Sequence, residues 1–247
     1  MGSAIKAEFR KFFTTRMWWG MAIGVLVAGA VFAAAFAFLA GSAGRGGGPR
    51  NSPLPTLDDP QMVASVYTGG LTVAYLLTLV VGVMSIGSEY RHKTITSTFL
   101  STPKRVRVMA AKVTSLLGIG AFYGLVFLVG SVGVGSVIIA LKGFSPLPDA
   151  GPIVRTLALS LLALGLWSLI GLGAGILIPN QIAAILIAVG AAWIVEPIAG
   201  VLLGLVSWGR PIVPFLPSAA PTAMVGEIRG DTSVVQLCGW AGALMLL

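Results

Sequence analysis

Four stretches of this 247-residue chain contain no Asp, Glu, Lys or Arg over lengths that can cross a lipid bilayer. They cover residues 17–44, 60–88, 113–141 and 156–195. A membrane-spanning helix needs about 20 apolar residues, and every stretch exceeds that length. The chain is also 56% hydrophobic and only 10% charged, which excludes a soluble globular domain with a polar surface. We therefore expect an all-α integral membrane protein.

The last charge-free run is 40 residues long, enough for two helices. Pro179 and Asn180 supply the polar, helix-breaking turn near its middle. A further apolar segment, residues 233–247, has 15 residues and is interpreted as an incomplete sixth span. The sequence thus predicts one transmembrane domain over residues 1–247 with six transmembrane helices. Their expected bounds are 18–40, 62–87, 113–140, 156–178, 182–203 and 233–247.

The basic residues between these segments are unevenly shared between the two sides. Ten Lys and Arg residues fall in the N-terminal segment and in the loop over residues 88–112, whereas six fall on the other side together with most of the acids. Cytoplasmic loops carry the excess of Lys and Arg. We therefore expect a multi-pass protein of the cell membrane with a cytoplasmic N-terminus and C-terminus. This topology accounts for the pI near 10.2 without nucleic-acid binding.

An amphipathic helix is predicted over residues 3–16, before the first span. Its apolar face comprises Ile5, Phe9, Phe12 and Phe13, and its opposite face carries Lys6 and Arg10. Such a helix is expected to lie in the cytoplasmic interface of the membrane rather than to cross it. The alternative is an ordinary basic flank of the first span.

Two enzyme classes lack the residues that they need. Gly87 to Lys93-Thr94 has the spacing of a phosphate-binding loop, but His92 replaces the second glycine and a membrane helix precedes the segment. His92 is also the single histidine, so a metal pair or a Ser-His dyad within the membrane cannot form. Cys238, the single cysteine, cannot form a disulfide within the chain. We expect no catalytic residue, no metal site and no cofactor in this chain.

The loop over residues 88–112 is too apolar for a purely solvated connection. Ile95, Phe99 and Leu100 lie among its cations, and Thr102-Pro103 is typical of a helix start. The loop should form a short helical piece and then a second helix, which begins at Pro103 and runs through Lys112 into the third span, so that a helix-break-helix projects into the cytosol. It could bind anionic lipid headgroups or dock a cytosolic partner, and the apolar residues favour docking.

This loop and its setting resemble those of the type-two ABC exporter permeases. The resemblance rests on Glu89-x-Arg91, Lys93-Thr94, Leu100, Pro103 and Lys112, together with the N-terminal amphipathic helix and six spans. It covers essentially the whole chain. Many members of the family have glycine where this chain has Lys93.

The resemblance implies that the loop couples the spans to a separate ATP-hydrolysing subunit. The residues expected to dock it are Glu89, Arg91, Lys93, Thr94, Phe99, Leu100 and Pro103. The expected partners are two cytosolic ATP-binding-cassette subunits, which hold ATP and Mg, a second permease copy or a sister permease, and the lipid bilayer. The family also implies a re-entrant helical hairpin between the fifth and sixth spans.

Two features of the spans allow more than one interpretation. Glu196 is either a helix-end acid, satisfied by backbone groups that Pro197 frees or by Arg210, or a residue of the substrate pathway or gate together with Trp193. The small residues of spans three to five either let helices pack closely or line a groove for an apolar substrate. These residues are Gly130, Gly133, Gly135, Gly165, Gly171, Gly173 and Gly175.

The function expected from the sequence is that of the membrane-spanning permease subunit of an ATP-driven exporter for an apolar or amphipathic substrate. One alternative is a membrane subunit that docks an ATPase for a regulatory or structural purpose without transporting. An ion-coupled secondary transporter is the other, but it usually places several ionisable groups at mid-membrane and only Glu196 comes near that depth.

Overall fold

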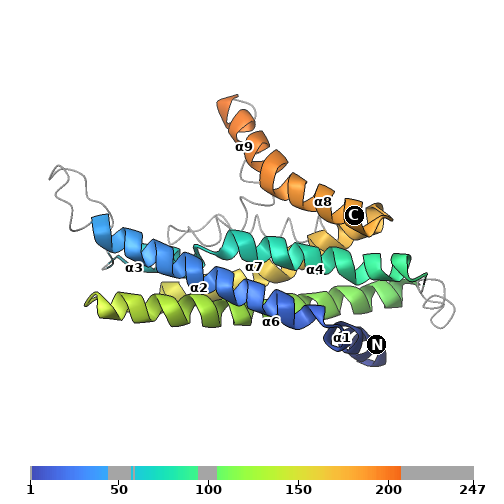
Figure 1. The fold of residues 1–247 in the computed structure, drawn as a ribbon, viewed down its shortest axis with the longest axis horizontal. Coiled ribbons are helices and arrows are strands. Elements are labelled where there is room, and N and C mark those ends of the chain that lie inside the picture. The colour runs from blue at the N-terminus through green and yellow to red at the C-terminus, as the bar shows by residue number, and fades with distance from the viewer. Residues whose placement is uncertain (1, 44–56, 58, 94–104, 207–247) are drawn as a thin grey trace.

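A computed structural model describes residues 2–43, 57, 59–93 and 105–206 of the chain (Figure 1). No strand occurs in this part, which is helical apart from turns and short connections. The prediction of an all-α protein is confirmed for these residues. The elements are α1 (Gly2–Thr14), α2 (Met17–Ala43), α3 (Pro60–Thr68), α4 (Leu71–Arg91), α6 (Arg105–Leu141), α7 (Ala150–Leu177), α8 (Gln181–Gly190), the π-helix η1 (Ala191–Val195) and α9 (Glu196–Leu205).

Within the described residues, five helical segments are long and apolar enough to cross a membrane. They cover Met17–Ala40, Pro60–Arg91, Val106–Leu141, Ala150–Leu177 and Gln181–Leu205. These segments match the first five predicted spans, although the second, third and fourth are longer at one or both ends. The sixth predicted span, residues 233–247, lies outside the described residues.

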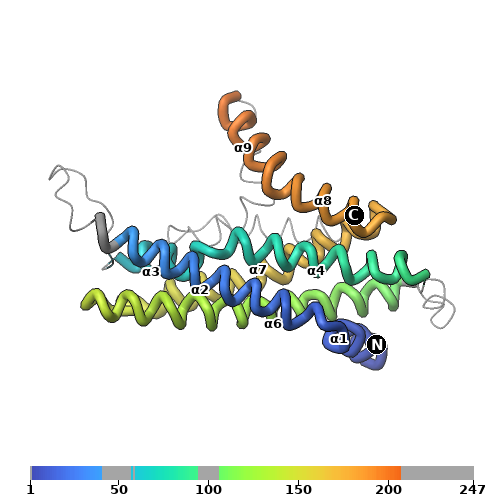
Figure 2. Tube along the Cα trace, in the orientation of Figure 1, coloured from blue at the N-terminus to red at the C-terminus, as the bar shows by residue number. Residues whose placement is uncertain are grey.

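Four helices, α2, α4, α6 and α7, run side by side and form the bundle (Figures 1 and 2). The helical run from α8 to α9 begins beside this bundle and then diverges from it. The short helix α1 lies across one end of the bundle and not along it. The C-terminal end of α4, the N-terminal end of α6 and the turn between α7 and α8 lie at that same end, which we call the α1 end.

Glycines bring the backbones of neighbouring helices into contact. A Cβ atom on Gly171 of α7 would collide with the carbonyl oxygen of Leu79 on α4, and one on Gly130 of α6 would collide with that of Leu26 on α2. Small residues at helix interfaces allow this close approach within membranes. Gly133 and Gly173, in contrast, have no neighbour within 4 Å of a Cβ position. Close packing therefore explains some of the predicted small residues but not all of them.

Side chains with capping propensity begin two of the helices. Asp59 Oδ1 accepts a hydrogen bond of 2.9 Å from the backbone N–H of Gln61, and Pro60 occupies the first turn of α3. Asn180 Oδ1 accepts hydrogen bonds of 3.0 and 3.3 Å from the N–H groups of Ile182 and Ala183. The helix break predicted at Pro179-Asn180 is thereby confirmed, and Asn180 explains where α8 starts.

The last described helix contains a π-turn just before Pro197. The hydrogen-bonding pattern widens over η1, Ala191–Val195, and the chain then stays helical through α9 to Leu205. Near Trp193 to Pro197 the chain therefore forms a π-helical turn inside a continuing helix. Residues 207–247, where the predicted re-entrant hairpin would return, lie outside the described residues. The hairpin stays a prediction.

Candidate functional site

A cluster of four charged side chains lies at the α1 end of the bundle. Lys112 Nζ on α6 lies 2.9 Å from Glu8 Oε2 on α1 and 2.9 Å from Glu89 Oε1 on α4. Lys11 Nζ on α1 lies 2.9 Å from Glu8 Oε1 and 2.9 Å from the same Glu89 oxygen. Each ammonium therefore bridges both carboxylates, and the cluster joins three helices.

The four members differ sharply in exposure. The side chain of Lys112 is 1% exposed and that of Glu89 is 7% exposed, whereas Glu8 is 15% and Lys11 is 53% exposed. A buried charge is tolerated only when it is paired and hydrogen-bonded, because removal from water costs several kcal/mol for each ion. Lys112 and Glu89 therefore depend on each other and on Glu8, while Lys11 remains in contact with solvent.

The pKa values of Glu8 and Lys11, the two cluster residues on α1, are shifted from their ordinary values. Burial raises the pKa of Glu8, but the charge of Lys112 and the hydrogen bonds from Lys11 and Lys112 outweigh it, so that the pKa lies below its ordinary value. Burial lowers the pKa of Lys11, but hydrogen bonds to Glu8 and Glu89 outweigh it and raise the pKa. Both shifts favour the charged forms at neutral pH.

The apolar face of α1 packs against α6. The ring of Phe9 would meet a Cβ atom on Gly118 at 2.7 Å, so the missing side chain of this glycine makes room for the ring. Phe12 contacts the edge of Tyr123 with ring centroids 6.0 Å apart, and Phe13 contacts Phe122 at 5.6 Å. The aromatic face expected to contact lipid is thus largely used within the protein. This packing holds Glu8 and Lys11 over the ends of α4 and α6.

The helix α4 ends in an unusual backbone conformation at Lys93. Arg91 and His92 are exposed, and the N–H of His92 donates to Ser88 O at 3.0 Å. Lys93 then adopts a φ of 55°, in the left-handed region that glycine enters without steric cost. The side chain of Lys93 therefore stands at a position that glycine would occupy with less strain.

The residues predicted to dock an ATPase are only partly described. Glu89, Arg91 and Lys93 lie at the C-terminal end of α4, whereas Thr94, Phe99, Leu100 and Pro103 lie outside the described residues. Arg91 and Lys93 are exposed, but Glu89 is turned inward to the cluster. Glu89 pairs with Lys11 and Lys112 within the chain, and docking by the seven predicted residues stays a prediction.

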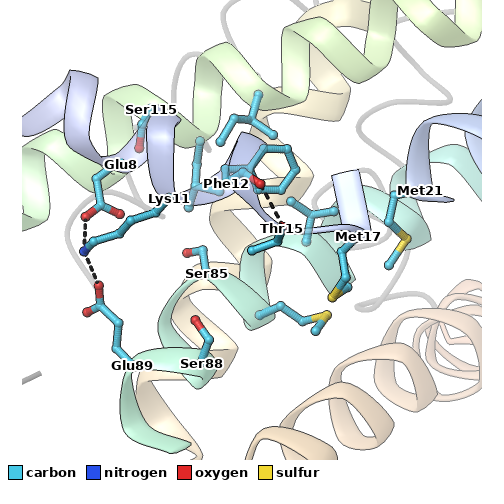
Figure 3. A pocket seen from close by; sticks show the side chains of 14 residues that line it. Glu8, Lys11, Phe12, Thr15, Met17, Met21, Ser85, Ser88, Glu89 and Ser115 are labelled. Atoms are coloured by element: carbon cyan, nitrogen blue, oxygen red, sulfur yellow. Dashed lines mark hydrogen bonds and ion pairs between the residues drawn. The ribbon is translucent and has the colours of Figure 1, made fainter. Parts of the chain in front are cut away.

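A cavity of about 130 Å³ opens beside the charge cluster (Figure 3). It lies between α1, α2, α4 and α6, and Glu8, Lys11 and Glu89 line one side of it. Most of the remaining lining is apolar, with Met17, Met21 and Met84 prominent in it. Lys112 is not part of the lining. The cavity therefore combines an apolar interior with a charged side.

The two residues predicted for a substrate pathway or gate lie next to the π-turn. Trp193 is 63% exposed on η1. Glu196 is the first residue of α9. On the neighbouring helices, Tyr75 of α4 stacks on Trp167 of α7, with ring centroids 4.4 Å apart. Arg210, the partner considered for Glu196, lies outside the described residues.

Sequence reasoning did not identify Glu8 and Lys11 as members of a site. Two signals could have indicated them. Glu8 is the one acid among the first 16 residues, which otherwise carry four cations, and it stands three positions before Lys11 on the same helix face. Lys112 lies directly before the apolar third span, where a charge that faced lipid would be costly.

No group of three or more potential metal-ligating residues occurs in the described part of the chain. Comparisons with models of protein families, with curated proteins and with solved structures find no match to the chain. The functional assignment therefore depends on the arrangement of the helices and on the charge cluster.

Proposed function

We propose that this chain is the membrane-spanning permease subunit of an ATP-driven exporter for an apolar or amphipathic substrate. The observation that carries the proposal is the charge cluster of Glu8, Lys11, Glu89 and Lys112. It ties α1 to the last turns of α4 and to the first turns of α6, which are the two helices that flank residues 94–104. A force on this connecting segment would reach three helices together.

This linkage suits a membrane subunit that is moved by a partner in the cytosol. In the proposed cycle, two ATP-binding-cassette subunits dock at residues 88–112, and closure of those subunits on ATP and Mg pushes the segment. The glycine contacts between α4 and α7 and between α2 and α6 would carry the displacement onward, because closely packed helices move as units. ATP would thus bias a two-state change of the spans.

The distribution of charge supports the orientation in this proposal. Basic residues gather at the α1 end, with Lys6, Arg10 and Arg16 on or beside α1 and Arg91 at the end of α4. That end would face the cytoplasm of the cell membrane, by the bias of Lys and Arg towards cytoplasmic loops. A second copy of the chain or a sister permease would complete the transport unit.

A non-transporting subunit that docks the same ATPase would use the same linkage, so a docking test has to be followed by a transport test. An ion-coupled transporter fits the described spans less well. Within the five described spans the acidic side chains are Glu196 and Glu89, and Glu89 is paired with Lys112 in the last turn of α4. Proton or ion relays usually need several such groups.

Site-specific photo-crosslinking tests the proposal directly. A photoreactive amino acid replaces Leu100 in the predicted docking segment, and in a second variant it replaces Leu147, an exposed residue between α6 and α7 at the other end of the bundle. The proposal predicts a crosslink from position 100 to a cytosolic ATPase in intact cells and none from position 147. Absence of an ATPase adduct at position 100, with adducts to lipid alone, would overturn it.

A further inference from the structure

The cavity beside the charge cluster has the size of a small ligand. Its volume is about 130 Å³. An engineered apolar cavity of about 150 Å³ in another protein binds benzene, so this space can hold one aromatic ring or a short branched chain. Val81, Met84, Leu116 and Ile119 supply apolar walls, and methionine side chains adapt their shape to different guests.

One wall of the cavity carries an unused polar group. The hydroxyl oxygen of Ser85 is buried and has no hydrogen-bond partner among the described residues. Figure 3 shows Ser85 on α4 between the charge cluster and the apolar part of the cavity. A buried hydroxyl without a partner costs free energy, which a guest with a hydrogen-bonding group would recover.

On the charged side of the cavity, one cation could be replaced by the ammonium of a ligand. Lys11 Nζ contacts Glu8 Oε1 and Glu89 Oε1, and its side chain is 53% exposed. Lys112 contacts the same two carboxylates, but it is 1% exposed and does not line the cavity. The carboxylates need cations around them because they are largely removed from water. A guest ammonium could take the place of Lys11 Nζ while Lys11 turns to solvent and Lys112 stays.

We infer that this cavity is a binding site for a primary ammonium attached to an apolar body about the size of a benzene ring. The ammonium would lie on Glu8 and Glu89 in place of Lys11 Nζ, and the body would fill the space beside Met84 and Leu116. Such an ammonium belongs to a free amphipathic amine. The ammonium of phosphatidylethanolamine is joined through two methylenes to a phosphate, whose negative charge suits neither the apolar walls nor the two carboxylates. The inference concerns the chain alone and does not depend on the proposed exporter function.

Binding of 2-phenylethylamine to the purified full chain tests the site. The protein is placed in phosphatidylcholine nanodiscs, and 2-phenylethanol serves as the neutral ligand of the same shape, so that partition into lipid is common to both. We expect saturable binding of the amine and none of the alcohol. Lys11→Met should tighten amine binding by about tenfold, because it removes a tethered competitor whose effective concentration is in the millimolar range. Lys6→Met, an exposed change on the same helix, should leave the affinity unchanged.

A cavity-filling variant tests the location of the apolar body. Ser85→Leu should abolish binding of the amine, whereas Ser136→Leu, the same change on α6 towards the other end of the bundle, should leave it intact. Misfolding of a variant cannot produce a gain of affinity. Lys11→Met therefore tests the site even if Ser85→Leu disturbs the fold. Equal binding of amine and alcohol, or an affinity unaffected by both Lys11→Met and Ser85→Leu, would overturn the inference.

Nanodiscs that contain phosphatidylethanolamine test whether the site needs the apolar body. The inference predicts that this lipid does not compete with 2-phenylethylamine. Competition by the lipid would show that the site recognises the ammonium without an apolar body and would overturn the inference.

Discussion

The ammonium of Lys112 lies 2.9 Å from the carboxylate of Glu89, and both side chains are almost completely buried. The two residues stand 23 positions apart, on the two helices that flank the segment 94–104. Glu8 reaches the same ammonium from α1. The two helices that flank the segment and the N-terminal helix are therefore held together by charges that have little access to water.

Removal of the central cation should destabilise the chain strongly. Lys112→Met leaves the buried carboxylate of Glu89 with Lys11 alone and should lower the free energy of unfolding by about 3–5 kcal/mol, the usual cost of breaking a buried ion pair. The measurement is the unfolding midpoint in detergent. Lys6→Met removes a cation from exposed α1 surface and serves as the control. An equal midpoint for Lys112→Met and the wild type would contradict the structure of the cluster.

Two glycines on α7 should respond oppositely to alanine. Gly171→Ala places a Cβ atom against the backbone carbonyl of Leu79, so α4 and α7 must separate, and the loss should be about 1–3 kcal/mol or more. Gly173→Ala meets no neighbour and should be neutral or stabilising by up to about 1 kcal/mol, because alanine favours the helix. Thermal unfolding of the two variants compares them directly. Equal destabilisation would show that the α4–α7 contact is not as close as described.

The contribution of Glu8 should depend on pH. Its pKa in the folded chain is lowered from the ordinary value of 4.5, so its stabilising effect is complete above that value and is lost as the pH falls through the folded pKa. The difference in melting temperature between the wild type and Glu8→Gln should therefore be largest near neutral pH and should shrink below about pH 4.5. A difference that stays constant from pH 7 to pH 3 would exclude a paired, ionised Glu8.

The backbone strain at Lys93 should be relieved by glycine. Lys93→Gly removes the side chain from a left-handed position and should stabilise the end of α4 by about 1 kcal/mol. Lys93→Ala removes the same charge but keeps a Cβ atom, so it should give no such gain. Thermal unfolding of both variants separates the two effects. A gain in the alanine variant alone would point to charge and not to backbone conformation.

The spans of this chain could be predicted because they depend on local composition. Charge-free length alone places the five described spans, and Pro179-Asn180 locates the turn between two of them. The pairing of Glu8, Glu89 and Lys112 could not be predicted in this way, since periodicity shows which face a residue occupies but not which distant helix meets it. An aromatic face such as that of α1 could pack against lipid or against another helix. In the structure Phe12 and Phe13 pack against α6.

The glycines show the same limit of prediction from the sequence. Gly171 and Gly173 stand two residues apart in the same apolar sequence, yet a Cβ atom on the first would collide with α4 and one on the second would meet nothing. The sequence indicates that small residues are frequent, but the direction of each one is set by how the helices cross. The sequence likewise does not show that Glu89 pairs with Lys11 and Lys112, because these partners come from α1 and α6.

Co-purification measures the central claim most directly. The tagged chain is isolated from its own cells in mild detergent, and the accompanying proteins are identified and tested for ATP hydrolysis. The account predicts a stoichiometric cytosolic ATPase that is retained by Lys6→Met and is lost or reduced when Arg91 or Leu100 is replaced by alanine. Recovery of the intact, folded chain without any ATPase would contradict it.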